Sequence, residues 1–288
     1  MSAINRLSPD TFPPQLREIP EPPKELYLEG AWPSPESVLV TIVGSRKYSN
    51  YGREACEKII SELSGYPIAI VSGLAIGIDT IAHKAALAAK LYTLAVPGSG
   101  LERRVLHPAS NRQLADQILE SGGALLSEFP PEYPAGLHTF PRRNRIMAGL
   151  ANAVLIIEAG EKSGTLITAR LATDYNRDVY AVPGSIFSAG SVGTNNLIRQ
   201  GATPIMSGGD LLTALGFELP NESAQQKLNL DELSEPEKKI YEILSVESMH
   251  RDELIRILEL PTSEANSLLG IMEIKGIIKE TMGEIRLN

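Results

Sequence analysis

The chain is 288 residues long with a formal net charge of -8, and this length predicts one large domain together with a smaller one. Its hydrophobic fraction of 43% and charged fraction of 22% are typical of a soluble globular protein, and no apolar run approaches the roughly 20 residues that a membrane span needs. The N-terminus lacks the apolar core of a signal peptide, and the single cysteine, Cys56, can form no intramolecular disulfide, so we expect a cytoplasmic protein. The four histidines are scattered without metal-ligand spacing, which argues against a zinc site.

The first part of the chain, residues 1–37, is rich in proline and shows neither helical nor strand periodicity. We expect it to be an extended segment laid on the next domain, or partly disordered. From Val38 onward, short apolar runs that end in Gly, Ser or Pro-Gly alternate with stretches of helical period. This alternation predicts a doubly wound, mostly parallel, Rossmann-like α/β sheet over residues 38–217, with ligands bound by the loops at the carboxyl ends of its strands.

A polar linker is predicted over residues 218–230, and residues 231–288 follow with three helical patterns and then "KETMGEIRL", a two-stranded wing with Gly283 at its turn. This order predicts a small C-terminal winged-helix domain. The domain has 13 acidic and 7 basic residues, a net of -6, which leaves -2 for the rest of the chain. Its third helix carries Glu264, Glu273 and only Lys275, so we expect a protein-contact or regulatory module rather than a DNA reader.

The first strand-end loop of the large domain is "VGSRKYSNYG", in which Ser45 supplies a hydroxyl and Arg46 and Lys47 supply charge where a helix begins. The free N–H groups and the dipole of a helix N-terminus favour an anion there. The glycines do not form G-x-G-x-x-G, which argues against a dinucleotide cofactor. From this loop alone, a phosphate contact and a solvated turn remain equally open.

The second loop, "SGLAIGIDTIAH", places Gly73 and Gly77 before a helix that begins near Asp79. Aspartate is a favoured N-cap residue, and a carboxylate is a poor neighbour for a phosphate, so we expect Asp79 to cap the helix. The N–H groups of the two glycines remain free to approach a phosphate in this prediction.

The third loop is "TFPRRNRIMAG", with three arginines at the start of a helix predicted to begin after Pro141. Positive charge at a helix N-terminus opposes the dipole, so these side chains need another purpose. Guanidinium groups pair well with phosphates, and the amide side chain between the arginines could bond to a base or to the DNA backbone. The alternative is that the arginines form ion pairs with Glu128, Glu132 or Glu158. The aromatic ring before the helix could stack on an unpaired base or simply pack against the helix. The candidate residues are Phe140, Arg142, Arg143, Asn144 and Arg145.

The fourth loop, "EAGEKSGTLITAR", has Lys162, Ser163, Gly164 and Thr165 at a strand-to-helix turn. It resembles a truncated phosphate cradle without the spacing of a P-loop, so ATP hydrolysis is not supported. Four anion-competent loops at one end of one sheet exceed the needs of a mononucleotide, and a continuous polyanion fits them better.

Six motifs, "VGSR", "SGLAIGID", "FPRRNRI", "SGTLITA", "VPG" and "GTNNLIRQGA", in this order on these strand ends, closely resemble the DNA-processing protein A family (DprA, also called Smf). The resemblance implies a homodimer without enzymatic activity or cofactor that binds single-stranded DNA, protects it during natural transformation and helps to load the RecA recombinase. It implies DNA contacts by Arg46 and Lys162, a pocket lined by the glycines and the Arg-Asn-Arg run, and a dimer interface near Leu197 and Ile198. Many members begin with a small helical domain similar to a sterile alpha motif, whose roles we do not transfer to residues 1–37.

Two alternatives compete with this interpretation. A nucleotide hydrolase similar to the lysine-decarboxylase-like nucleoside monophosphate phosphoribohydrolases would need a catalytic carboxylate, but aligning its Gly-Thr with Gly164 and Thr165 puts Thr168 there. The other alternative is an adaptor protein whose basic loops make only internal ion pairs. Neither explains the four loops as well as single-stranded DNA does.

Overall fold

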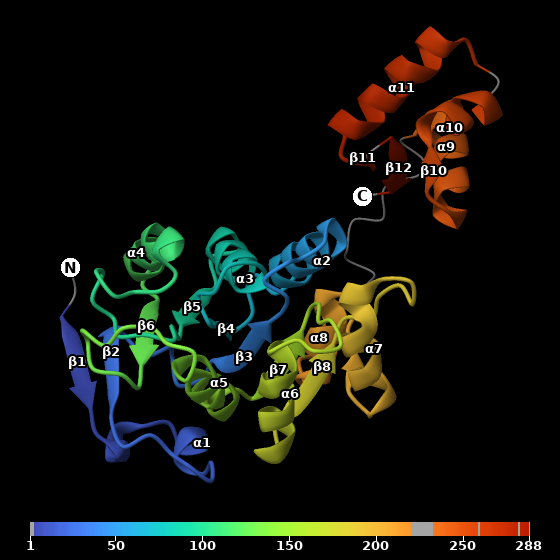
Figure 1. Cartoon of the computed structure of the whole chain (residues 1–288). Helices are drawn as coiled ribbons and strands as arrows, with labels where there is room; N and C mark the ends of the chain where they lie inside the picture. The colour runs from blue at the N-terminus through green and yellow to red at the C-terminus, as the bar shows by residue number, and fades with distance from the viewer. Residues whose placement is uncertain (1–2, 220–232, 259, 282, 288) are drawn as a thin grey trace. The chain divides into compact units, whose positions relative to one another are not determined.

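The computed structural model describes residues 3–219, 233–258, 260–281 and 283–287. The chain divides into two compact units, Met1–Leu219 and Pro220–Asn288 (Figure 1). Of the predicted linker over residues 218–230, residues 220–230 lie outside the described part. None of the helices in the described ranges combines the length and the apolar character that a bilayer crossing requires.

The first unit is built on a nine-stranded sheet with the order β1-β2-β6-β5-β4-β3-β7-β8-β9. Its strands β3 to β9 pair in parallel, whereas β1 pairs with β2 and β2 with β6 in antiparallel fashion. This is the mostly parallel, doubly wound sheet that the sequence predicts. The strands are β1 (Ile4–Leu7), β2 (Leu26–Gly30), β3 (Val38–Val43), β4 (Ile68–Ser72), β5 (Tyr92–Ala95), β6 (Ala124–Ser127), β7 (Ala153–Ile156), β8 (Asp178–Ala181) and β9 (Thr203–Pro204).

The central strands are apolar throughout because both faces of the sheet are covered. In β7, Val154 and Ile156 belong to one core cluster, while Ala153 and Leu155 belong to another. Successive side chains of a strand point to opposite faces, so a strand covered on both sides has no polar positions. A continuous apolar run is therefore the expected sequence of such a strand.

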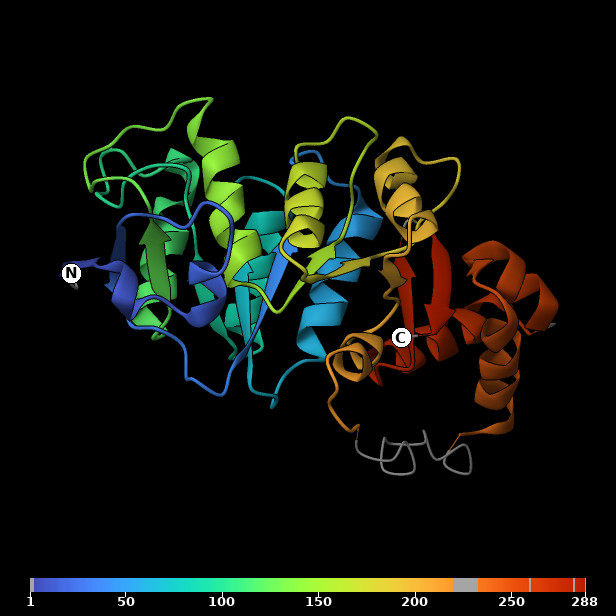
Figure 2. The same ribbon diagram turned by 90° about the horizontal axis from the view of Figure 1, so that it is seen from below.

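Helices cover the two faces of the sheet separately, as Figures 1 and 2 show. One face carries α1 (Pro14–Arg17), α5 (Thr139–Leu150), α6 (Thr165–Asp174) and α7 (Val192–Arg199). The other carries α2 (Asn50–Ser61), α3 (Ile78–Ala88), α4 (Arg112–Glu120) and α8 (Gly208–Ala214). Short 3-10 turns lie at Pro9–Thr11, Ala109–Asn111 and Ala189–Ser191.

The proline-rich N-terminal segment belongs to this unit, and its strands are the main feature of the fold that the sequence does not predict. β1 and β2 extend the sheet beyond β6, and Phe12, Leu16 and Ile19 between them are buried in the core. The alternative of partial disorder is wrong for residues 3–37, since they are ordered by pairing with β6 and by this burial. Buried Glu29 on β2 also pairs with Arg103, with 3.0 Å between Oε2 and Nη1.

The second unit contains three helices, α9 (Glu235–Val246), α10 (Arg251–Leu258) and α11 (Thr262–Ile274), and three short strands, β10 (Met249–His250), β11 (Ile278–Thr281) and β12 (Glu284–Leu287). The strands pair in the order β10-β12-β11. β11 and β12 form the predicted wing, and Gly283 at its turn has a φ of 84°, a conformation that favours glycine. These elements confirm the winged-helix prediction.

Candidate nucleic-acid interface

The candidate site lies where the direction of winding in the sheet reverses. From β3 the chain winds outward through β4, β5 and β6, and then returns to place β7 on the other side of β3. The loops after β3 and β7 consequently diverge and leave a crevice beyond the carboxyl ends of these two strands. Ligands of open α/β sheets bind in such a crevice.

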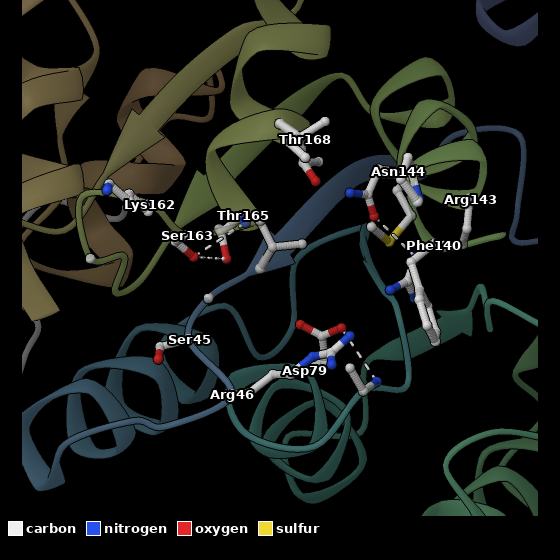
Figure 3. A pocket seen from close by; sticks show the side chains of 18 of the residues that line it. Ser45, Arg46, Asp79, Phe140, Arg143, Asn144, Lys162, Ser163, Thr165 and Thr168 are labelled. Atoms are coloured by element: carbon white, nitrogen blue, oxygen red, sulfur yellow. Dashed lines mark hydrogen bonds between the residues drawn. The ribbon is translucent and has the colours of Figure 1, made fainter. Parts of the chain in front are cut away.

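A cavity of about 650 Å³ occupies this crevice. Figure 3 shows Lys162, Ser163 and Thr165 on one side of it, Phe140, Arg143 and Asn144 on the opposite side, and Arg46 with Asp79 below. The structure therefore brings together residues from all four predicted loops. Ten of the predicted site residues line the cavity: Ser45, Arg46, Lys47, Phe140, Arg143, Asn144, Lys162, Ser163, Gly164 and Thr165.

The loop after β3 is held in place by its own hydrogen bonds and by the start of α3. The Ser45 hydroxyl donates to the Lys47 carbonyl (2.8 Å) and accepts from the Lys47 N–H (3.0 Å), so it shapes the turn. The Ile78 N–H donates to the Ser45 carbonyl at 3.2 Å. Arg46 is exposed, and its guanidinium carbon lies 5.3 Å from the centroid of the Phe140 ring. The turn therefore holds its backbone firmly while Arg46 and Lys47 reach into solvent.

The loop after β4 contradicts the predicted capping role of Asp79. The N-cap of α3 is Gly77, with a φ of 90°, and a Cβ there would lie 2.4 Å from the Ser45 carbonyl oxygen. Asp79 lies in the first turn instead, and its Oδ2 accepts from the N–H groups of Gly73 (3.1 Å) and Ala75 (3.4 Å). Gly73 and Gly77 thus allow close packing behind the cavity and do not line it.

Arg143 is a buried residue, only 6% exposed, and its Nη1 donates to the carbonyls of Gly73 and Val96, the latter at 2.7 Å. A Cβ on Gly73 would lie 1.9 Å from Arg143 Nη1 and 2.6 Å from Asp79 Oδ2, so these two atoms are at most 4.5 Å apart. Burial raises the pKa of the Asp79 carboxyl, and Arg143 opposes that shift. Burial likewise lowers the pKa of Arg143, and Asp79 opposes it. Arg143 therefore ties α5 to the loops after β4 and β5.

The other two arginines of α5 have internal partners outside the cavity. Arg142 Nη2 lies 3.2 Å from Glu128 Oε1, and Arg145 pairs with the same carboxylate and with the Glu21 carbonyl. The side chain of Arg145 is only 12% exposed, whereas that of Arg142 is 54% exposed. Both residues thus pair with Glu128, which is the alternative to a phosphate contact that the sequence left open. α5 also begins at Thr139, earlier than the start predicted after Pro141.

The loop after β7 presents its polar groups at the N-terminus of α6. Ser163 Oγ accepts from the Thr165 N–H (3.2 Å) and donates to Thr165 Oγ1 (3.0 Å). Lys162 is exposed beside them. In the part of the chain that the structure describes, no ion pair involves Arg46, Lys47 or Lys162. These three cations and the helix N-terminus form a site that favours an anion.

Apolar side chains complete the cavity, and they are not among the predicted site residues. Leu137 is 91% exposed and Ile167 is 45% exposed, and both line the cavity together with Met147. Ile167 could have been found from the period of α6, since it follows Gly164 at a spacing of three; Leu137 lies in an irregular loop that carries no such signal. The predicted dimer residues Leu197 and Ile198 lie on α7, partly buried and away from the cavity lining.

Two family models match the chain: DNA recombination-mediator protein A over residues 4–216 and DprA winged helix domain over residues 224–284. The chain is 43% identical over 208 residues to Protein Smf of Escherichia coli (strain K12), a match that covers 72% of this chain and 55% of that protein. It is 43% identical over 209 residues to DNA processing protein DprA of Streptococcus pneumoniae, covering 72% of each. The chain thus spans about half the length of the Escherichia coli relative.

Solved structures of DNA processing protein A resemble the chain over about three quarters of its length. The X-ray structure of DNA processing protein A from Streptococcus pneumoniae matches with a TM-score of 0.69 and 40% identity, covering 75% of each chain. DNA processing protein A from Helicobacter pylori matches with a TM-score of 0.66 and 28% identity, covering 74% of this chain and 96% of the other. The latter structure is described as showing a single-stranded DNA binding mode.

Proposed function

The chain belongs to the DNA recombination-mediator protein A family, and from this premise we propose that it binds single-stranded DNA in the cavity beyond the carboxyl ends of β3 and β7. The observation that carries the proposal is the set of exposed cations Arg46, Lys47 and Lys162, which line the cavity and form no ion pair among the described residues. Arg46 does lie near enough to Asp79 to oppose the rise that burial causes in the pKa of that carboxyl. Cations left unpaired at the end of a sheet supply the charge that phosphates neutralise. The description of the Helicobacter pylori relative supports the same ligand.

The phosphates are bound from two sides in this proposal. Arg46 approaches from the loop after β3, and Lys162 approaches from the loop after β7 together with the N–H groups at the start of α6. Arg143 supports DNA binding indirectly, by holding the loops behind the cavity, because its guanidinium donates to backbone carbonyls. Arg145 is removed from the set of proposed contacts, since its side chain is largely buried against Glu128.

An unpaired strand suits this site better than a duplex. The cavity of about 650 Å³ can admit only part of a strand, and Phe140 and Leu137 offer apolar surface to a base. In a duplex the bases are stacked and paired, so they cannot reach these side chains. We therefore expect weak sequence preference and a clear preference for single strands.

A gel-shift or anisotropy titration with single-stranded and duplex DNA of equal length tests this function. Arg46→Ala and Lys162→Ala should each weaken single-strand binding and reduce the slope of log affinity against log salt by about 0.7 for each phosphate that the variant no longer neutralises. Lys58→Ala is the matched control, because Lys58 is exposed on α2 and is absent from the cavity lining. Salt-independent binding, or two cavity variants that bind like the wild type, would refute the proposal.

At a finer level, we propose that the protein acts in the cytoplasm as a homodimer through the region of Leu197 and Ile198 on α7. It would protect incoming single-stranded DNA and help to load RecA during natural transformation, without catalysing a reaction itself. Family membership and the motif resemblance support these roles. Ile198→Glu should lower the mass of the protein in solution, and the rate at which RecA accumulates on a coated single strand tests the loading role directly.

The phosphoribohydrolase alternative lacks its catalytic acid. Thr168 stands in the expected position and is buried, and the one carboxylate in the described lining is Asp79, whose Oδ2 accepts two backbone N–H groups near Arg143. Neither residue is placed to act as a general acid or base on a bound nucleotide. Release of free base from a nucleoside monophosphate by the purified protein would reverse this ranking.

A further inference from the structure

Beside the cavity, three aromatic rings are exposed on two neighbouring segments: the loop after β8, and the stretch that runs from the loop after β3 into the first turn of α2. Phe187, in the loop after β8, is 92% exposed, and Tyr48 and Tyr51, after β3, are 44% and 52% exposed. Phenylalanine is among the residues most often buried, and clustered exposed apolar side chains commonly mark an interaction site. We refer to Tyr48, Tyr51 and Phe187 as the aromatic shelf.

The loops that carry the shelf contact each other and the loop that carries Lys162. The Tyr51 hydroxyl donates to the Pro183 carbonyl at 2.6 Å. Buried Glu158, two residues after the end of β7, accepts from the Ser49 N–H at 2.9 Å. The Gly193 N–H donates to the Ala159 carbonyl at 2.7 Å. Since β3, β7 and β8 are adjacent parallel strands, their loops form one continuous edge, and the shelf extends the cavity along it.

The loop that presents Phe187 is fixed although its tip is exposed. The Asn195 side chain donates to the Gly184 carbonyl (3.0 Å) and accepts from the Gly184 N–H (3.2 Å). The Phe187 N–H donates to Ser185 Oγ at 3.2 Å. An exposed ring on a fixed loop can bind a partner with little loss of conformational entropy.

The charges around the shelf favour a polyanion as its partner. Residues 45–53, 160–164 and 183–195 contain four basic residues and one acidic residue, Glu161, and the buried carboxylate of Glu158 lies beneath them. The segment around Phe187, residues 183–195, contains no charged residue. A chain of phosphates with flat bases matches rings flanked by cations. The basic residues are Arg46, Lys47, Arg53 and Lys162.

We propose that the aromatic shelf stacks the bases of single-stranded DNA that continues beyond the cavity, with Phe187 as its outer platform. The inference rests on the proposed function and extends it, because it assigns a path to the strand from the cavity over the loop after β3 to the loop after β8. Every base can stack on an aromatic ring, because every base has a flat π face, so the shelf should add affinity without sequence preference.

The test compares three variants on an oligothymidine of about 20 nucleotides, long enough to extend beyond one binding module. Phe187→Ala should weaken binding at least about fivefold, the lower end for removal of one stacked base. Phe187→Tyr keeps the ring and should bind like the wild type. Ile186→Ala, which removes an exposed apolar side chain of the same loop without removing a ring, should also bind like the wild type.

An abasic strand of the same length and the salt dependence separate stacking from phosphate contact. On the abasic strand, Phe187→Ala and the wild type should bind equally, and the salt slope of Phe187→Ala should match the wild type. If Phe187→Ala binds the normal strand like the wild type while Lys162→Ala is impaired, the shelf is refuted and the proposed function stands. If the wild-type protein binds no single strand, the proposed function itself fails. If Phe187→Ala lowers the mass of the protein in solution, the ring belongs to a contact between two copies, which also overturns the shelf.

Discussion

A carboxylate in the wall of an anion site makes a sharp test of the proposed binding mode. Asp79 lines the cavity together with Arg46 and Lys162, and its negative charge opposes the approach of a phosphate. Asp79→Asn removes that charge and keeps an oxygen to accept from the N–H groups of Gly73 and Ala75. We expect this variant to bind single-stranded DNA more tightly than the wild type.

The size of the cavity sets the magnitude of this effect. A volume of about 650 Å³ corresponds to a sphere roughly 11 Å across, so a bound phosphate lies within that distance of Asp79. At about 8 Å and an effective dielectric constant of about 40, two like charges repel by about 1 kcal/mol, which is about fivefold in affinity. Added salt should reduce the difference only modestly, because Asp79 is buried and salt screens buried charges less than exposed ones.

Fluorescence anisotropy of a labelled single strand, at low and high salt, measures the effect, with the thermal unfolding midpoint showing that the variant is folded. Asp174→Asn is the control for net charge, because Asp174 is exposed at the far end of α6. Burial raises the pKa of Asp79, so lowering the pH should protonate it and strengthen wild-type binding, while the asparagine variant responds less. If folded Asp79→Asn binds more weakly or equally at low salt, the phosphate does not enter this cavity.

Three further outcomes are expected. Gly73→Ala should lower the free energy of unfolding by about 1–3 kcal/mol, since its Cβ would lie 1.9 Å from Arg143 Nη1, and chemical denaturation measures this decrease. Glu237 accepts from Lys275 Nζ at 2.7 Å, and this contact together with the Ser234 N–H lowers the pKa of Glu237 to about 2. A carboxyl group whose pKa is lower in the folded than in the unfolded protein stabilises the fold at pH values above the unfolded pKa, and this stabilisation is lost as the pH falls towards 2. Glu237→Gln should therefore speed hydrogen exchange in α9 at neutral pH and have little effect near pH 2. Removal of residues 231–288, with their net charge of -6, should not weaken single-strand binding in a titration.

The central sheet could be predicted from the sequence because strands buried on both faces leave continuous apolar runs. Each strand from β3 to β9 lies in one of the short apolar runs predicted over residues 38–217. The N-terminal strands could not be predicted in this way, because they are separated by prolines and are ordered by pairing: β2 pairs with β6, and β1 pairs with β2 at the edge of the sheet. The local sequence pattern does not give the order of the strands in the sheet, so the crevice beyond the carboxyl ends of β3 and β7 could be located only from the topology.

The arginine run shows how helix geometry separates neighbouring residues. Arg142 and Arg145 are three apart, share one face of α5 and reach the same carboxylate, Glu128. Arg143 points about 100° away from Arg142 around the helix and enters the interior. The helical spacing alone therefore predicts that Arg143 points in a different direction from Arg142 and Arg145. Only the fold could show that Arg143 donates to backbone carbonyls and that the other two arginines pair with a glutamate.

The positive character of the site does not come from the net charge of the protein. The unit that contains it is close to neutral, and two of the three arginines in its most basic segment are compensated by Glu128. The third, Arg143, holds the loops behind the cavity and lies within 4.5 Å of Asp79. What remains for a ligand is a small set of exposed cations, Arg46, Lys47 and Lys162, on loops whose backbones are fixed by hydrogen bonds. A few cations on fixed loops favour a strand whose phosphates match their spacing, whereas a diffuse basic surface would attract any polyanion. The preference for single strands is therefore expected from the geometry of the site.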